Sequence, residues 1–164
     1  MKKVSVITTM DCDADGFWKL FFDREFNQKL YKEGLGFKSY DILEMTETSR
    51  RTKGVPAMKL PGPVAKLLGD SFGYEENGAL DKASGIYRWK MTPNTMTDKL
   101  FTSGSVKIEA AGDGKVKRTS EATIEAKMFG VGGLLEGTAE AEMRASWEKE
   151  TAFMSRWIRE KSGK

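Results

Sequence analysis

Residues 128–161 read MFGVGGLLEGTAEAEMRASWEKETAFMSRWIREK. Apolar side chains recur in this stretch about every four residues, at Leu135, Ala139, Met143, Trp147, Met154 and Ile158. This is the spacing of one helical face, and charged residues such as Glu140, Arg144 and Glu148 fall on the opposite face. A helix over residues 134–161 would be about 40 Å long. So long an apolar stripe needs a large apolar partner, which the rest of the chain must supply.

The preceding chain is rich in short segments typical of antiparallel strands. We predict strands over residues 3–10, 37–46, 49–58, 72–76, 86–92, 100–110 and 115–128. Gly112-Asp113-Gly114 is the strongest hairpin turn in the sequence, and Asn77-Gly78 is a second turn signal that ends the strand at Glu76.

Two short helices interrupt the strands early in the chain. Asp11 or Asp13 is expected to cap the first, which runs through Phe17 and Phe21. The second covers residues 25–31, and a further short helix is expected over 61–68. The order of elements predicts one α+β domain over residues 1–164, in which the last helix covers one face of an antiparallel sheet.

The composition excludes several kinds of active site. The 164 residues include no histidine, so Ser-His-Asp and Cys-His catalysis and histidine-based zinc sites are excluded. Hydrophobic residues make up 39% and charged residues 31%, as in an ordinary globular protein. The net charge of +3 is spread along the chain, and with no basic, aromatic-laced patch we expect no nucleic-acid partner.

We expect a cytoplasmic protein. The opening residues lack the long apolar core of a signal peptide. No apolar run approaches the ~20 residues of a membrane span. Cys12 is the only cysteine and forms no intramolecular disulfide.

The order of elements resembles the helix-grip fold of the START/Bet v1-like (SRPBCC) superfamily. The most specific local piece is FGVGGLLEG at 129–137, which leads from the last strand into a helix that ends with a Trp such as Trp157. A similar transition occurs in the DUF2505 family, and the sterol-binding VASt-type domains also look related. The resemblance implies a curved seven-stranded antiparallel sheet wrapped around the long C-terminal helix, with two short helices after the first strand. It also implies a hollow between sheet and helix that holds an apolar molecule.

The residues themselves also favour a hollow. Small inward residues such as Gly104, Ser120, Ala122 and Ala126 are expected to leave room, and Met and Trp on the helix offer adaptable walls. The alternative is a solid core, without a cavity, in which Trp89, Trp147 and Met143 pack against one another. We expect the following residues to bind the ligand: Tyr87, Trp89, Met91, Val106, Arg118, Ser120, Ala122, Ile124, Leu135, Met143, Trp147 and Met154.

Arg118 shares a strand face with Val116, Ala122 and Ile124, and an unpaired buried guanidinium would be very costly. It would meet an interior carboxylate, a polar group of a ligand, or solvent at the strand end. We favour solvent, because Gly114 is close.

Other motifs predict no metal and no cofactor. The run Asp11-x-Asp13-x-Asp15-Gly16 resembles half of a calcium loop, but Phe22 stands where the loop needs its glutamate. Gly130-x-Gly132-Gly133 lacks the last glycine of a dinucleotide site. Carboxylates such as Glu75, Glu76 and Glu121 are interpreted as surface residues.

The leading hypothesis is non-enzymatic binding or transfer of a lipid, sterol or similar hydrophobic molecule by a monomer, with transient membrane contact. We favour it over two alternatives. One is a cyclase- or dehydratase-like enzyme on the same fold, for which no interior acid stands out. The other is a protein-interaction module with a collapsed cavity.

Overall fold

The computed structural model describes residues 1–161 and forms a single sheet with helices on one of its faces. The strands are β1 (Lys2–Met10), β2 (Ser39–Met45), β3 (Ser49–Val55), β4 (Tyr74–Asp81), β5 (Ile86–Pro93), β6 (Leu100–Ala110) and β7 (Val116–Ala126). They are ordered β1-β7-β6-β5-β4-β3-β2, and every neighbouring pair is antiparallel. The helix-grip architecture inferred from the sequence is confirmed.

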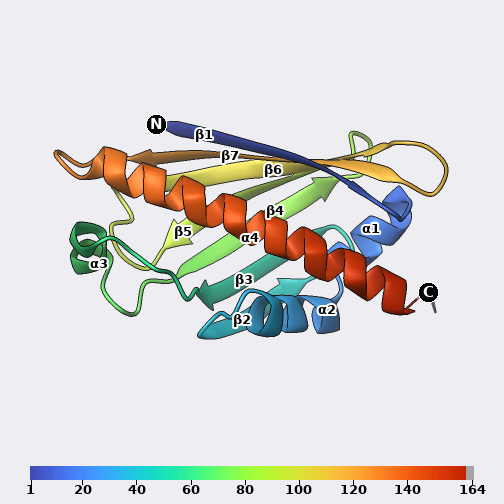
Figure 1. Ribbon diagram of the computed structural model, residues 1–164, viewed down its shortest axis with the longest axis horizontal. Helices are drawn as coiled ribbons and strands as arrows, with labels where there is room; N and C mark the ends of the chain where they lie inside the picture. Colours follow the sequence, from blue (N-terminus) through green and yellow to red (C-terminus); the bar gives the residue numbers. More distant parts are fainter. Residues whose placement is uncertain (162–164) are drawn as a thin grey trace.

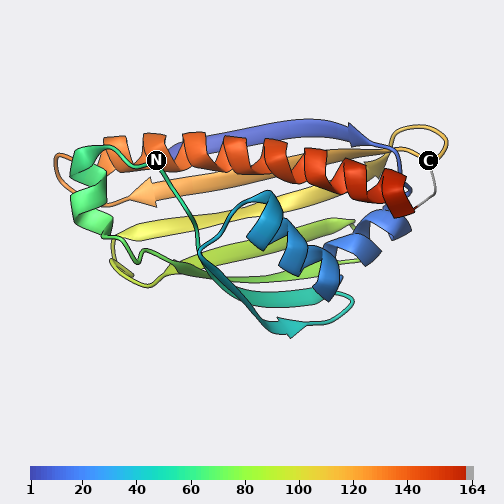
Figure 2. The ribbon, with the colours of Figure 1, turned by 60° about the horizontal axis from the view of Figure 1, so that its bottom comes forward.

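Helix α4 (Gly132–Lys161) runs along one face of the sheet (Figures 1 and 2) and contacts β1 and β7. Three shorter helices are α1 (Ala14–Phe21), α2 (Arg24–Lys29) and α3 (Gly62–Leu68), and a π-helical turn, η1 (Leu30–Gly34), follows α2. The link from β1 at one edge of the sheet to β2 at the other therefore passes through α1, α2 and η1. No helix among residues 1–161 combines the length and apolar character of a membrane span.

The starts of α1 and α2 follow from side-chain capping. The Asp13 side chain accepts a hydrogen bond of 2.7 Å from the backbone N–H of Gly16 at the start of α1, and Asp23 does the same for Phe26 in α2. These carboxylates satisfy N–H groups that the first turn of a helix leaves free. Of the two expected caps, Asp13 is the one that acts.

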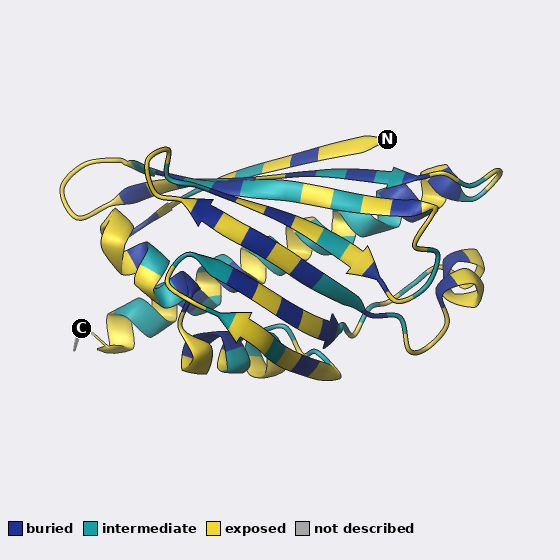
Figure 3. Cartoon of the chain, turned by 180° about the vertical axis from the view of Figure 1, so that it is seen from behind, coloured by how far each residue is buried: buried dark blue, intermediate teal, exposed yellow. Residues whose placement is uncertain are grey.

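Burial alternates along the strands (Figure 3), because successive side chains point to opposite faces. The inward side chains form two separate apolar clusters. One lies toward α1 and α2 and includes Phe17, Phe26, Ile124 and Met154. The other lies toward α3; it contains Val64, Leu68, Leu100, Ala126 and Leu135. The two clusters leave space between them.

One predicted turn is wrong. Asn77 and Gly78 do not end a strand but lie inside β4, and the turn comes later, at 82–85, where Gly85 has a φ of +68°. The reason is packing. A Cβ on Gly78 would overlap the phenol of Tyr87 on β5, so the glycine makes room for that ring.

Two further sequence expectations need correction. The strand predicted over residues 49–58 ends at Val55. Gly104 does not open the interior, because a Cβ there would lie only 2.5 Å from the indole of Trp89, which covers the glycine. The room that a small inward residue leaves is filled by its neighbour on the next strand.

Candidate functional site

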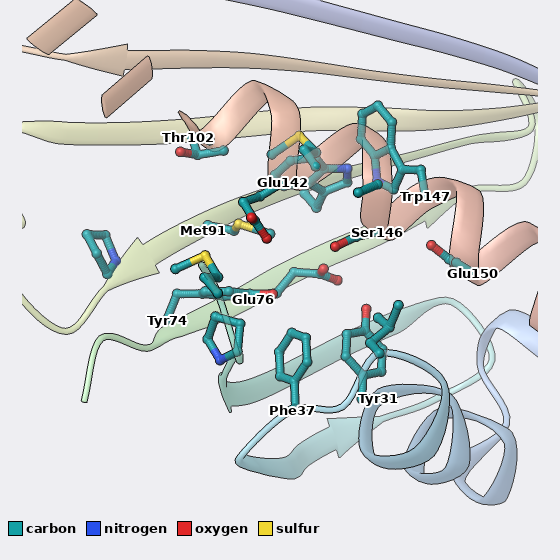
Figure 4. A pocket seen from close by; sticks show the side chains of 18 of the residues that line it. Tyr31, Phe37, Tyr74, Glu76, Met91, Thr102, Glu142, Ser146, Trp147 and Glu150 are labelled. Carbon is teal, nitrogen blue, oxygen red and sulfur yellow. The ribbon is translucent and has the colours of Figure 1, made fainter. Parts of the chain in front are cut away.

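A cavity of about 190 Å³ lies between the sheet and α4, in the space between the two apolar clusters (Figure 4). Its sheet wall comes mainly from β3, β4, β5 and β6, and its roof comes from α4. Part of η1 and the 56–60 segment form the remaining wall. A hollow at this position agrees with the hollow expected from the sequence.

Aromatic and sulfur-containing side chains form much of the lining. They are Phe21, Tyr31, Phe37, Met58, Phe72, Tyr74, Tyr87, Trp89, Met91, Met143 and Trp147. Flat rings and flexible thioethers are well suited to contact a planar apolar molecule. The lining residues that are exposed, Ala57, Ala145 and Lys149, place the opening between the 56–60 segment and the middle of α4.

A buried polar cluster lies at the α1–α2 side of the cavity. Glu76 of β4 accepts hydrogen bonds on the same oxygen, Oε2, from Nε of Arg50 at 2.8 Å and from the hydroxyl of Tyr87 at 2.7 Å. Nη1 of Arg50 donates to the carbonyl of Phe21 and to Oδ1 of Asn27, each at 3.2 Å. The guanidinium also lies 4.0 Å from the centre of the Phe21 ring. The cluster fixes the position of the Glu76 carboxyl group.

The electrostatics of this cluster are those of a paired interior charge. Burial opposes the charged form of Arg50 and is the largest single effect, but Glu76 together with Tyr87, Tyr31 and Tyr40 outweighs it, so that the pKa of Arg50 is raised. Burial raises the pKa of Tyr87, Tyr74 and Tyr31, all of which line the cavity. These phenols therefore remain neutral and can donate or accept hydrogen bonds.

The expectation that Arg118 reaches solvent is wrong. Only 3% of Arg118 is exposed; its Nη1 donates to Oε1 of Glu150 on α4 at 3.1 Å, and its Nε donates to Ser120 at 3.0 Å. The guanidinium lies 5.5 Å from the centre of the Phe17 ring. Arg118 thus meets an interior carboxylate, which was one of the two other possibilities, and the pair lines the cavity.

Eight of the twelve residues expected to bind a ligand line the cavity. They are Tyr87, Trp89, Met91, Val106, Arg118, Leu135, Met143 and Trp147. The remaining four, Ser120, Ala122, Ile124 and Met154, are buried and do not line it. The reason is the position of α4: it contacts β1 and β7, which closes that side of the interior.

Three buried charged residues of the site were missed. Glu76 was placed in the false turn at Asn77-Gly78, whereas strand parity with Tyr74 and Leu80 puts it on the inward face. Glu150 fills the one position between Trp147 and Met154 where the apolar stripe of α4 skips a turn, and that gap in the spacing could have revealed it. For Arg50 the sequence carries no such signal.

Among residues 1–161 no group of three or more His, Cys, Asp or Glu side chains gathers where it could hold a metal ion. The single cysteine, Cys12, lies outside the cavity lining. Burial and the adjacent Asp13 and Asp11 raise the pKa of its thiol. What the site offers is therefore shape, aromatic surface and paired charges.

Comparison with known proteins agrees with this architecture. The family described as "Protein of unknown function (DUF2505)" matches residues 5–158. No protein in the curated set matches the sequence.

Several solved structures share the fold. The Zhui aromatase/cyclase from Streptomyces sp. R1128 aligns with a TM-score of 0.70 at 13% identity, covering 96% of both chains. Norcoclaurine synthase from Thalictrum flavum, in complex with dopamine and hydroxybenzaldehyde, aligns at 0.68 and 14% identity, covering 97% of this chain and 87% of the synthase. A START superfamily protein from Mycobacterium smegmatis aligns at 0.61 and 13% identity, covering 95% and 98%. At these identities the likeness concerns the fold.

Proposed function

Because this chain belongs to the DUF2505 family and has the START/Bet v1-like fold, we propose that it binds a small, largely apolar molecule in the cavity under α4. The observation that carries the proposal is the hollow of about 190 Å³ between two otherwise close-packed apolar clusters. Protein interiors normally fill such a space. Transfer of apolar ligand surface from water, at about 25 cal/mol per Å², drives binding before the costs of association.

The cavity volume favours a molecule with one ring or with two fused rings. A cavity of about 150 Å³ in another protein holds benzene, and this one is somewhat larger. A lipid or sterol, which the sequence led us to expect, needs displacement of the 56–60 segment at the opening. The aromatic walls also favour a planar ligand. Support comes from two neighbours of the same fold, an aromatase/cyclase and a synthase bound to dopamine and hydroxybenzaldehyde.

A second candidate is an enzyme of the cyclase or dehydratase type on the same scaffold. Glu76 favours it, because this carboxylate is the interior acid that such chemistry requires and it lines the cavity. Its Oε2 atom already accepts two hydrogen bonds, from Arg50 and Tyr87. A carboxylate held in this way suits anchoring of a ligand better than proton transfer, so binding remains our preferred function. An interaction module with a collapsed interior is disfavoured by the open cavity.

The test is uptake of an apolar fluorescent probe, together with native mass spectrometry of the freshly purified protein. We expect a co-purifying small molecule or saturable probe binding in the wild type. Met143→Glu places a charge in the cavity lining and should abolish uptake. Ala141→Glu adds the same charge at an exposed position of the same helix and should leave uptake intact. Equal uptake by both variants, or none by the wild type, would refute the proposal.

Membrane contact, a monomeric state and a cytoplasmic location remain predictions. Exposed apolar side chains at the α3 end, Leu67 on α3 and Phe129 and Leu134 near the start of α4, are where we expect membrane contact. Co-flotation with anionic vesicles that is lost in Phe129→Ser would support it, and its absence in the wild type would exclude it.

A further inference from the structure

We propose that the ligand carries a neutral or cationic hydrogen-bond donor, a hydroxyl or an amine, that binds Oε1 of Glu76, and that the cavity discriminates against carboxylates. This inference rests on the proposed binding function and specifies its ligand class. It follows from how the hydrogen bonds of Glu76 are distributed and from how the interior cations are paired.

Glu76 has a free side that faces the cavity. Both of its hydrogen bonds, from Arg50 and from Tyr87, end on Oε2. A carboxylate has about four acceptor sites on its two oxygens, so Oε1 can accept a further donor. Figure 4 shows the Glu76 side chain extending into the cavity beside Met91 and below α4. A ligand donor at this position would complete the coordination of a carboxylate that is only 6% exposed.

The interior cations, in contrast, already have partners. Arg50 donates to Glu76, to the Phe21 carbonyl and to Asn27, and its face lies against the Phe21 ring. Arg118 donates to Glu150 and Ser120. The third cation of the lining, Lys149, is exposed at the opening.

An anionic ligand would therefore find its counterions already paired. Its carboxylate would lie near Glu76 and Glu150 in a poorly hydrated space, where an unpaired charge is costly. The neutral phenols of Tyr31 and Tyr74 could offer it hydrogen bonds but no charge. A hydroxyl or amine, in contrast, gains a charge-assisted hydrogen bond from Glu76.

Three probes with the same two-ring body test this inference: 2-naphthol, 2-methoxynaphthalene and 2-naphthoate. Their affinities for the wild-type protein are measured by calorimetric titration at pH 7. A hydrogen bond to a charged group corresponds to a preference of roughly tenfold or more. We therefore expect 2-naphthol to bind at least about tenfold more tightly than 2-methoxynaphthalene, and 2-naphthoate to bind most weakly.

Equal or tighter binding of either 2-methoxynaphthalene or 2-naphthoate would overturn the inference while leaving the binding function standing. Binding of none of the three would count against the binding function itself. This ranking uses only the wild-type protein, so it does not depend on whether a variant folds.

Two matched variants then assign the anchor. Glu76→Gln should remove the preference for 2-naphthol. Glu75→Gln should retain it, because Glu75 pairs with Arg51 at 3.1 Å on the exposed face of the sheet and does not line the cavity. Retention of the preference in folded Glu76→Gln would contradict the role given to Glu76.

Discussion

Arg118 on β7 and Glu150 on α4 form a buried ion pair of 3.1 Å that joins the long helix to the inward face of the sheet. The pair lies where the main apolar cluster meets the cavity, and both residues line the cavity. It therefore connects the structural role of α4 with its role as the roof of the site.

Removal of one partner of this pair should destabilise the protein strongly. Arg118→Met leaves the Glu150 carboxylate buried without its cation, and loss of one member of a buried pair typically costs about 3–5 kcal/mol. The double variant Arg118→Met/Glu150→Leu should recover most of that loss, because two apolar side chains can replace a buried ion pair. Urea unfolding of both single variants and the double variant measures the coupling. If the losses in free energy of unfolding of the two single variants simply add in the double variant, the two side chains are not energetically coupled and the prediction is wrong.

Gly78→Ala and Gly137→Ala should have opposite effects on stability. The new methyl group at position 78 would meet the Tyr87 phenol, and overpacking of this kind typically costs about 1–3 kcal/mol. Gly137 lies within α4 with no atom near its added Cβ, so alanine there should stabilise the helix by up to about 1 kcal/mol. Thermal unfolding of the two variants is the measurement. Stabilisation by Gly78→Ala would show that the ring does not occupy this space.

The chain should lose stability in alkali. Its four tyrosines, Tyr31, Tyr40, Tyr74 and Tyr87, all have a pKa raised by burial, to about 12 for Tyr40. Each phenol holds its proton more tightly in the folded chain than in the unfolded one. The contribution of these phenols to the free energy of unfolding is therefore fully present below pH 10, the tyrosine pKa in the unfolded chain. It is lost as the pH rises above 10 toward the pKa values of the folded chain.

Phenolate absorbance against pH tests this in the native and the denatured protein. We expect no tyrosine to ionise near pH 10 in the native protein and all of them to do so in denaturant. Native titration of a tyrosine near pH 10 would show that its ring reaches water.

Filling the cavity from the helix should block probe binding without unfolding the protein. Ala139→Trp places an indole in the lining, where it competes with a ligand for the same space. Ala141→Trp adds the same ring at an exposed position two residues along α4 and serves as the control. We expect at least a tenfold loss of affinity in the first variant only, which corresponds to about 1.4 kcal/mol. Unchanged affinity in Ala139→Trp would place the ligand elsewhere.

The sequence was sufficient for the architecture because that depends on periodicity. The four-residue spacing from Leu135 to Ile158 and the alternation along the strands report which face of each element is apolar. Such patterns need no knowledge of the partner element. The same logic predicted the side chains of Tyr87, Trp89 and Met91, which share one face of β5, as part of the cavity wall.

Periodicity failed where a residue's role depends on a neighbour far away in the chain. Asn77-Gly78 has the local chemistry of a turn, but Gly78 belongs in a strand because the ring of Tyr87 packs over it. That error removed Glu76 from the inward face. Similarly, the small size of Gly104 predicted open space in the interior, but the indole of Trp89 occupies that space.

The sequence alone thus determined a curved antiparallel sheet under one long helix, since the spacing of apolar residues encodes local geometry. Tertiary structure decided where the cavity lies and which charged side chains line it. The position of α4 over β1 and β7 closes one side of the interior, and the pairs Arg50–Glu76 and Arg118–Glu150 form between elements distant in the chain. Buried charges are tolerated only with partners, and which partners meet is a property of the folded chain.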